Sequence, residues 1–474
     1  MLQSSLVQRS GPDSSQLSPE GESATDLNIP RRDMLRMLFG GTVAHFSGVL
    51  SAEASSGIDD KHLLNTKLEE IRKESINLLA YHRIGGLLLD QGPYLDRQVC
   101  NIAAEGFACC GLIIGVETGQ LSRREAASII DEMLHAIESS PQIRFKGWIS
   151  HLIDLGNPGE LKPYITQNGE RNSVSEFSSI DTALFMMGAL IAAHYFGEDY
   201  KIASRVRALL SELDFKGLMP TAENVSRGAV LSHGFSFNGE QIPHFWDTCS
   251  EGVLVSFLSQ AQATSSVNKD VWYQWDRRLF QLPLFTSYYP LAFLNLKGFT
   301  DASGVDLWER AEIRMQEHYD ECSPYLPHNL YGVTACYALD PQVCDLPKRT
   351  YKVLDRVTSR LDATIAPHAV VASLPFLKDK AIAAMKVLDE YGALNKGAGP
   401  INSIDLTSGL IDDWVTTIDV GSALLMLDAA ETKIIHRLSD LVPEFGLAKM
   451  RCRIRPRSER LAEANSDNPL ASSK

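Results

Sequence analysis

Three carboxylates in the sequence share one local frame that could support acid–base chemistry. Asp181, Glu251 and Asp419 each stand three residues after a serine or threonine and directly before an apolar stretch. This spacing is typical of a capping box, in which the hydroxyl and the carboxylate bind free backbone amides at the start of a helix. In an array of alternating up and down helices, three such starts would lie at the same end. Two interpretations of these carboxylates stay open. They could cap the helices, or they could surround one opening as site acids, and the two roles are compatible.

The three acids differ in how well they suit proton donation. The start of a helix favours an ionised carboxylate and so lowers its pKa, which suits a base or an acceptor of sugar hydroxyls. Glu251 follows Trp246 and Asp247, whose aromatic surface and negative charge would raise the pKa of a nearby carboxyl group. Glu251 is therefore the candidate proton donor for cleaving a glycosidic bond, a step that needs a protonated carboxyl.

Aromatic and polar side chains that could bind a sugar stand mostly in the predicted connections. Aromatic rings stack on the apolar faces of sugar rings, while Asp and His bind the hydroxyls. Each residue alone could instead be a packing residue, and Asp362 could equally cap a helix. Together they favour a carbohydrate over a charged substrate. The candidate binding residues are Trp148, His151, Asp181, Trp246, Asp247, Asp362, Trp414 and Asp419.

Signatures of several other chemistries do not occur in the sequence. H-E-x-x-H, G-x-x-x-x-G-K-[ST] and G-x-S-x-G are missing, which argues against a zinc protease, a P-loop enzyme and an α/β-hydrolase. The cysteines form no C-x-x-C and fit buried small apolar residues better than a metal site. One disulfide among Cys322, Cys336 and Cys344 stays open. We expect no metal and no cofactor.

The elements that must position these residues are helices. From residue 62 to residue 437 the apolar residues recur mostly at helical spacing, and strand-like alternation is scarce. The stretches after Ile102, Thr182 and Val420 are apolar on nearly all faces, which is typical of inner helices. Residues 69–79 and 378–391 are amphipathic and would cover them. The sequence therefore predicts an all-α fold, an (α/α)6 toroid in one domain.

The overall charge argues against one class of partner. Among 474 residues there are 45 Lys and Arg against 59 Asp and Glu, a formal net charge of −14. Phosphate backbones attract basic surfaces, so nucleic acid is not expected as a partner.

The two ends of the chain differ from the rest. Residues 1–54 resemble a twin-arginine export signal: Arg31 and Arg32 precede an apolar run too short to span a membrane, and Ala52 and Ala54 form a cleavage step. We expect the twin-arginine export machinery to deliver the chain to the periplasm or outside the cell, with no stable membrane insertion after processing. The alternative is a buried N-terminal helix. Residues 60–440 form the predicted catalytic domain, and residues 441–474 form a basic, then polar, tail.

Seven sequence blocks, taken in order, resemble the bacterial glycoamylase-like family, which contains the endo-β-1,2-glucanases. They span about residues 65 to 435, nearly the whole mature chain. The resemblance implies an (α/α)6 toroid and hydrolysis by acidic residues in a central cleft, without a required metal. The blocks are residues 101–107 (N-I-A-A-E-G-F), 119–126, 176–184 (E-F-S-S-I-D-T-A-L), 246–251 (W-D-T-C-S-E), 331–335, 362–367 with 372–376, and 418–421 (I-D-V-G).

The resemblance also implies roles for four acids. Glu251 falls on a candidate proton donor, Asp181 and Asp419 fall on the acids of two blocks, and Asp405 corresponds to an acid just before the last block. We take Asp405 as the candidate base. We expect inversion, which would place the two catalytic carboxyls about 6.5 to 9.5 Å apart with water between them.

The chain departs from the family pattern at positions that line the family's cleft. Val420 and Ser422 stand where the family has Gln and Pro, and His368 stands where it has Thr. Residues 283–290 lack both histidines of the family's stretch.

Three hypotheses follow from the sequence. The first is an exported glycoside hydrolase acting on β-linked glucan or a related oligosaccharide. The second is a catalytically silent glycan-binding relative. The third is a polysaccharide lyase, which would need a Tyr or His base near basic residues, whereas the motifs here are acidic.

Overall fold

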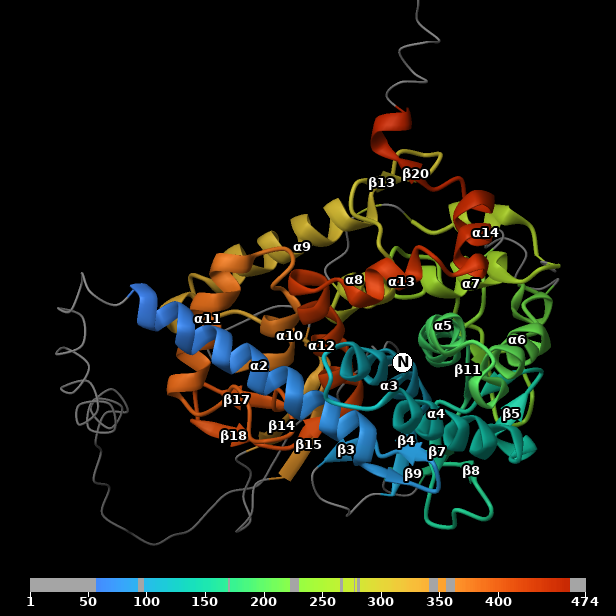
Figure 1. The fold of residues 1–474 in the computed structure, drawn as a ribbon, viewed down its shortest axis with the longest axis horizontal. Coiled ribbons are helices and arrows are strands. Elements are labelled where there is room, and N and C mark those ends of the chain that lie inside the picture. The colour runs from blue at the N-terminus through green and yellow to red at the C-terminus, as the bar shows by residue number, and fades with distance from the viewer. Residues whose placement is uncertain are drawn as a thin grey trace, which may run out of the picture. The chain divides into compact units, whose positions relative to one another are not determined.

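The computed structural model describes residues 57–92, 98–168, 171–221, 230–264, 267–276, 278, 282–340, 348–354 and 363–460. The predicted export signal at residues 1–54 lies outside them. Residues 68–474 make up one compact unit, and of the preceding part only the beginning of α2 (Gly57–Tyr81) is described. The unit is mainly helical, which agrees with the predicted class at that level (Figure 1).

Three helices form the centre of the unit. α3 (Ile102–Glu117), α5 (Ser179–Phe196) and α12 (Thr417–Glu431) are buried on nearly every face, as their uniformly apolar sequences predict. α3 and α5 approach at two glycines: a Cβ added to Gly188 would lie 1.8 Å from the carbonyl oxygen of Gly106. Only residues without a side chain allow two helix backbones so close. The inner pair therefore depends on glycine at the crossing point.

Amphipathic helices surround this centre. α4 (Arg123–Glu138), for example, buries one stripe of apolar residues and begins at the capping box of Ser122, whose Oγ accepts from the amide of Glu125 at 3.2 Å. The other helices are α6 (Ile202–Glu212), α7 (Val253–Ala261), α8 (Phe285–Phe293), α9 (Leu307–Cys322), α10 (Pro367–Ala372), α11 (Lys378–Glu390), α13 (Ile434–Ser439) and α14 (Pro443–Arg451).

Short antiparallel sheets, which were not predicted, fix the starts of inner helices. β4 (Val99–Asn101) leads into α3, β11 (Phe177–Ser178) into α5, β16 (Thr364–Ile365) into α10 and β19 (Val415–Thr416) into α12. Each of these strands pairs with a strand from elsewhere in the chain, so the first turn of each helix is held at a set place. Most strands have only two or three residues and carry no visible alternation.

The remaining strands pair in the same way. β4 and β8 flank β7, β16 and β18 flank β17, and every other pair is two-stranded. Their bounds are β1 (Arg83–Ile84) with β2 (Leu87–Leu88), β3 (Gln91–Gly92) with β19, β5 (Arg144–Phe145) with β6 (Trp148–Ile149), β7 (Leu152–Asp154) with β8 (Lys162–Pro163), β9 (Ile165–Asn168) with β10 (Arg171–Val174), β11 with β12 (Gly234–Phe235), β13 (Phe299–Thr300) with β20 (Arg455–Pro456), β14 (Cys336–Asp340) with β15 (Lys348–Lys352), and β17 (Ser403–Asp405) with β18 (Leu410–Asp412).

The C-terminal segment is folded further than expected. α14 buries Phe445, whose ring lies 5.8 Å from that of Phe257 in α7, and Arg451 donates to the carbonyl oxygens of Gln260 and Gln262. The prediction that a tail begins at residue 441 is therefore wrong, because residues up to Pro456 belong to the folded unit.

Two further observations bear on the sequence-based expectations. The sequence analysis left open one disulfide among Cys322, Cys336 and Cys344. Cys322 and Cys336 are buried free thiols, so they are not bonded to each other, and Cys344 lies outside the described residues. Of the helices that the structure describes, α5 alone has the length and composition to cross a membrane. It is 89% buried inside the unit, as the core helix of a folded domain is.

Candidate functional site

Asp181 lies at the start of α5, where the hydroxyl half of the predicted capping box is present. Ser178 is the N-cap residue, and its Oγ accepts a hydrogen bond from the backbone amide of Asp181 at 3.2 Å. The same hydroxyl donates to Oδ2 of Asp181 at 2.5 Å. The side chain of Asp181 is thus held in one orientation, with its Oδ1 directed to another partner.

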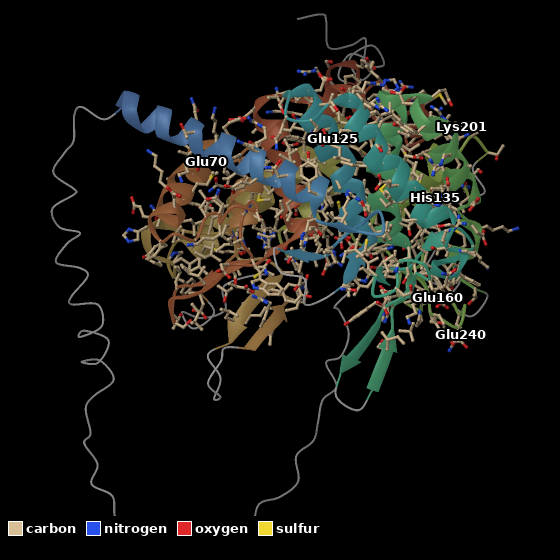
Figure 2. All side chains as sticks on the ribbon, turned by 60° about the horizontal axis from the view of Figure 1, so that its bottom comes forward. Glu70, Glu125, His135, Glu160, Lys201 and Glu240 are labelled. Carbon is tan, nitrogen blue, oxygen red and sulfur yellow. The ribbon has the colours of Figure 1, made fainter. Side chains whose placement is uncertain are left out.

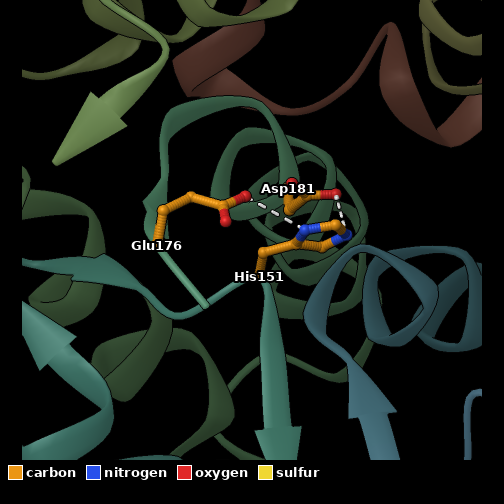
Figure 3. A group of neighbouring side chains, drawn as sticks. All are labelled: His151, Glu176 and Asp181. Carbon is orange, nitrogen blue, oxygen red and sulfur yellow. Dashed lines mark hydrogen bonds and ion pairs between the residues drawn. The ribbon is translucent and has the colours of Figure 1, made fainter. Parts of the chain in front are cut away.

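His151 lies between Asp181 and Glu176 (Figure 3). Its Nδ1 is 3.0 Å from Oε1 of Glu176, and its Nε2 is 3.8 Å from Oδ1 of Asp181. Burial lowers the pKa of His151, but the carboxylates of Asp181 and Glu176 outweigh burial and raise this pKa to about 9. Burial would raise the pKa of Glu176, yet its hydrogen bond to His151 lowers that pKa to about 2. At neutral pH His151 is therefore a cation held by two acidic side chains.

The same three side chains are the described group best suited to a metal ion. His151, Glu176 and Asp181 each offer one ligand atom, and these atoms lie within 4.8 Å of one another. A metal would need a neutral imidazole with a free lone pair. Here both ring nitrogens already face carboxylates, and the raised pKa keeps both protons on the ring. The arrangement suits an ion-paired group better than a metal centre.

Glu251 stands directly before α7 and has a buried, unpaired carboxyl oxygen. α7 begins at Val253 after Gly252, and no side chain caps it, so the predicted capping box at residues 248–251 is wrong. Oε2 of Glu251 is buried without a hydrogen-bond partner among the described residues. Burial raises the pKa of Glu251, a backbone hydrogen bond lowers it, and the charge of Asp181 raises it, with the result at about 7. Glu251 is therefore still partly protonated near neutral pH.

Trp246 connects the surroundings of these two acids. Its Nε1 donates to Oγ of Ser179 at 2.9 Å, and His233 stacks on the indole with the ring centroids 3.8 Å apart. A Cβ added to Gly252 would lie 2.4 Å from the indole, so the ring packs directly against the backbone before α7. Trp246 is 8% exposed and serves as a packing residue, which corrects its prediction as a sugar platform.

Asp419 lies in the first turn of α12, close to a buried tyrosine. No side chain caps this helix, and the hydroxyl of Thr416 donates instead to Oδ1 of Asn402 at 2.8 Å, so the capping box predicted there is also wrong. Burial raises the pKa of Asp419 well above its usual value, Asp90 raises it further, and a hydrogen bond from Tyr289 lowers it.

Tyr289 links Asp419 to Glu251. Its ring packs edge-to-face on Phe107 at 5.2 Å, and it is 4% exposed. Burial raises the pKa of its hydroxyl well above the usual value, and the charges of both Asp419 and Glu251 contribute to that rise. The charge of Asp181 thus acts on Glu251, and the charges of Asp419 and Glu251 both act on Tyr289, although the three acids are far apart in sequence.

A second histidine lies against Asp419. His368, at the start of α10, is fully buried, and its Nε2 is 3.5 Å from Oδ1 of Asp419. Neither of its ring nitrogens has a hydrogen-bond partner among the described residues, and burial lowers its pKa to about 3, so the ring is neutral. The sequence analysis noted His368 only because it stands where the family has threonine, and did not predict it as a site residue.

Asp405 is engaged elsewhere. It ends β17, and its Oδ1 accepts hydrogen bonds from the amides of Thr407 and Ser408 at 2.8 and 3.1 Å. These bonds close the turn between β17 and β18. The described contacts give the carboxylate of Asp405 a local role in its hairpin, and none joins it to Glu251.

The other predicted binding residues have different surroundings. Trp148 is fully buried and donates to the carbonyl of Asp214 at 3.3 Å, so it is a core residue rather than a sugar platform. Asp247 is exposed, and Trp414 is half-buried. Asp362 lies outside the described residues. Glu176, which the sequence analysis missed as a site residue, appears there only as the first residue of the block 176–184.

Comparison with known proteins supports the family resemblance. Residues 243–441 match the model of the Glycoamylase family, described as "Putative glucoamylase". No curated protein matches the chain.

Solved structures with the same fold cover most of the described chain. An endo-β-1,2-glucanase from Chitinophaga pinensis, in complex with sophorotriose and glucose, is 18% identical with a TM-score of 0.70, covering 83% of this chain and 98% of its own. A putative glucoamylase from Bacteroides fragilis is 18% identical with a TM-score of 0.71, covering 86% and 99%. An endo-β-1,2-glucanase mutant from Talaromyces funiculosus, in complex with β-1,2-glucan, is 11% identical with a TM-score of 0.53, covering 82% and 91%.

Proposed function

Because the chain carries the Glycoamylase family pattern over residues 243–441 and has the fold of solved glucanases, we propose that it is an exported glycoside hydrolase that cleaves β-linked glucan. The observation that carries the proposal is the buried carboxyl of Glu251, whose Oε2 has no hydrogen-bond partner among the described residues and whose pKa responds to the charge of Asp181. A buried carboxyl whose pKa lies at about 7 stands within the electrostatic reach of a second acid that is oriented by Ser178 and His151. Such a pair is what acid–base cleavage of a glycosidic bond needs.

In this mechanism Glu251 is the proton donor. As the bond between the anomeric carbon and the glycosidic oxygen breaks, the proton of Glu251 passes to the leaving oxygen. A water molecule adds to the anomeric carbon and gives its own proton to a carboxylate base. We propose Asp181 for the base in place of Asp405, because Asp181 interacts with Glu251 while Asp405 binds the amides of its own turn.

Substitution of the donor tests the proposal. Glu251→Gln should lose hydrolysis by about 10²- to 10⁴-fold, since the amide cannot donate the proton. Glu240→Gln is the matched control, because Glu240 is exposed and lies outside the site. The assay is release of reducing sugar from linear and cyclic β-glucans, including β-1,2-glucan. A donor variant that hydrolyses as fast as the wild type would refute the role of Glu251.

A second candidate function is glycan binding without turnover. His368 fills the space beside Asp419 with a neutral imidazole at a position where the resemblance implies threonine. Binding of glucan without release of sugar by the wild-type chain, across the same panel, would favour this candidate.

The toroid and export are parts of the proposal. Alternating inner and outer helices, together with TM-scores of 0.70 and 0.71, support closure of the helices into an (α/α)6 toroid. An experimental structure with an open helical array would contradict closure.

For export, replacing both Arg31 and Arg32 by lysine should leave the chain in the cytoplasm, and cell fractionation measures this.

A further inference from the structure

The hairpin of β14 and β15 presents an aromatic face that the proposed mechanism does not use. The register places Tyr337 opposite Tyr351 and Leu339 opposite Arg349. Cys336 is buried toward the core, and side chains alternate along a strand. Tyr337, Leu339, Arg349 and Tyr351 therefore share the other face, which we call the aromatic strip.

Tyr351 is the most exposed member of the strip and lies near the site. The residue is 44% exposed, and its ring packs edge-to-face on that of Tyr337, with centroids 5.0 Å apart at 64°. Burial raises the pKa of the Tyr351 hydroxyl well above its usual value, and the charge of Asp419 is the next contribution. One part of Tyr351 is thus open to solvent while its hydroxyl lies within reach of Asp419.

Arg349 extends the strip to Trp414. Its guanidinium lies 3.8 Å from the centre of the Trp414 ring and binds the buried carboxylate of Asp412 through Nε and Nη2 at 2.8 Å. The charge of Arg349 is therefore neutralised within the protein. A neutral surface of aromatic rings and fixed N–H groups suits an uncharged polyhydroxyl ligand better than an anion.

We infer that the aromatic strip binds consecutive sugar rings of a neutral glucan chain next to Asp419, with Tyr351 as the main stacking residue. The inference rests on the proposed function for the nature of the ligand. Continuity supports it: through Arg349 the strip reaches Trp414, which stands one residue before β19, and β19 leads into the helix of Asp419. The hairpins β9–β10 and β14–β15 project in the same direction from the unit, so the strip lies on a protruding element (Figure 2).

Substitution of Tyr351 tests the inference in the Glu251→Gln background, in which bound chains are not consumed. Tyr351→Ala should raise the Kd of a linear β-1,2-glucan oligosaccharide at least about tenfold, because ring stacking and its buried area are lost. Tyr351→Phe keeps the ring and should stay within about twofold. Tyr391→Ala is the matched control, since Tyr391 is 46% exposed at the end of α11. Isothermal titration calorimetry measures the affinities, and thermal unfolding checks that each variant is folded.

The outcomes separate this inference from the proposed function. If the wild-type chain hydrolyses glucan, Tyr351→Ala should raise KM with little change in kcat, and an unchanged KM overturns the inference alone. If the wild type hydrolyses nothing but Tyr351→Ala still weakens binding, the inference stands and the hydrolase proposal fails. Equal affinity of Tyr351→Ala and the control, or no binding of any glucan by the Glu251→Gln protein, overturns the inference.

Discussion

The unpaired carboxyl of Glu251 should make the chain less stable as the pH rises, and Glu251→Gln should remove this cost. Burial is the main reason that the pKa of Glu251 rises from 4.5 to about 7. Between these two values the unfolded chain has lost its proton while the folded chain keeps it. Stability is therefore fully present below pH 4.5 and declines as the pH rises through about 7.

The size of the effect follows from the two pKa values. One pKa unit corresponds to 1.36 kcal/mol, so the whole change is about 3 kcal/mol, and most of it falls between pH 5 and pH 8. Glutamine has nearly the shape of the protonated acid and does not ionise. We expect Glu251→Gln to match the wild type within about 1 kcal/mol at pH 5 and to exceed it by about 2 to 3 kcal/mol at pH 8, while hydrolysis is lost at both.

Urea unfolding at the two pH values measures these differences. Glu240→Gln, the exposed control, should differ from the wild type by the same amount at pH 5 and at pH 8. Parallel pH dependence of the wild type and Glu251→Gln would refute the reasoning, since it would mean that Glu251 ionises in the folded chain as easily as in the unfolded one.

Three further predictions follow from the site and the core. If Glu251 is the proton donor, kcat/KM should fall about tenfold per pH unit above pH 7, and a rate that stays level up to pH 9 would exclude it. Glu176→Gln should destabilise the chain most between pH 4.5 and 6.5 and cease to matter as the pH rises through about 9, where His151 loses its charge; an effect that persists above pH 10 would contradict this ion pair. Gly188→Ala should cost about 1 to 3 kcal/mol by forcing α3 and α5 apart, while Gly446→Ala, with open space around its Cβ, should cost little in thermal unfolding.

The inner helices could be predicted because a helix that is buried on all sides consists almost entirely of apolar residues. α3, α5 and α12 have almost no polar face, and the sequence placed all three near their observed starts. The short sheets could not be predicted, because a strand of two residues has no alternation and its partner lies far away in the chain.

The site was predicted in part. The frame of a hydroxyl three residues before an acid singled out Asp181, Glu251 and Asp419, and in the structure the charge of Asp181 acts on Glu251 while the charges of Glu251 and Asp419 both act on Tyr289. The frame does not decide where a helix begins: the packing of Trp246 on Gly252 places the start of α7 beyond Glu251. The pairing of Glu176 with His151 joins residues 25 positions apart, and no local pattern encodes it.

Trp246 also gives this chain an internal optical reporter. Its indole binds Ser179, two residues before Asp181, and packs on Gly252, one residue after Glu251, so neither acid can shift without disturbing the ring. The stacked imidazole of His233, whose pKa burial lowers to about 4, is uncharged near neutrality. Intrinsic fluorescence of Trp246 should accordingly register a ligand entering between the acids, and acidification through pH 4 should quench it.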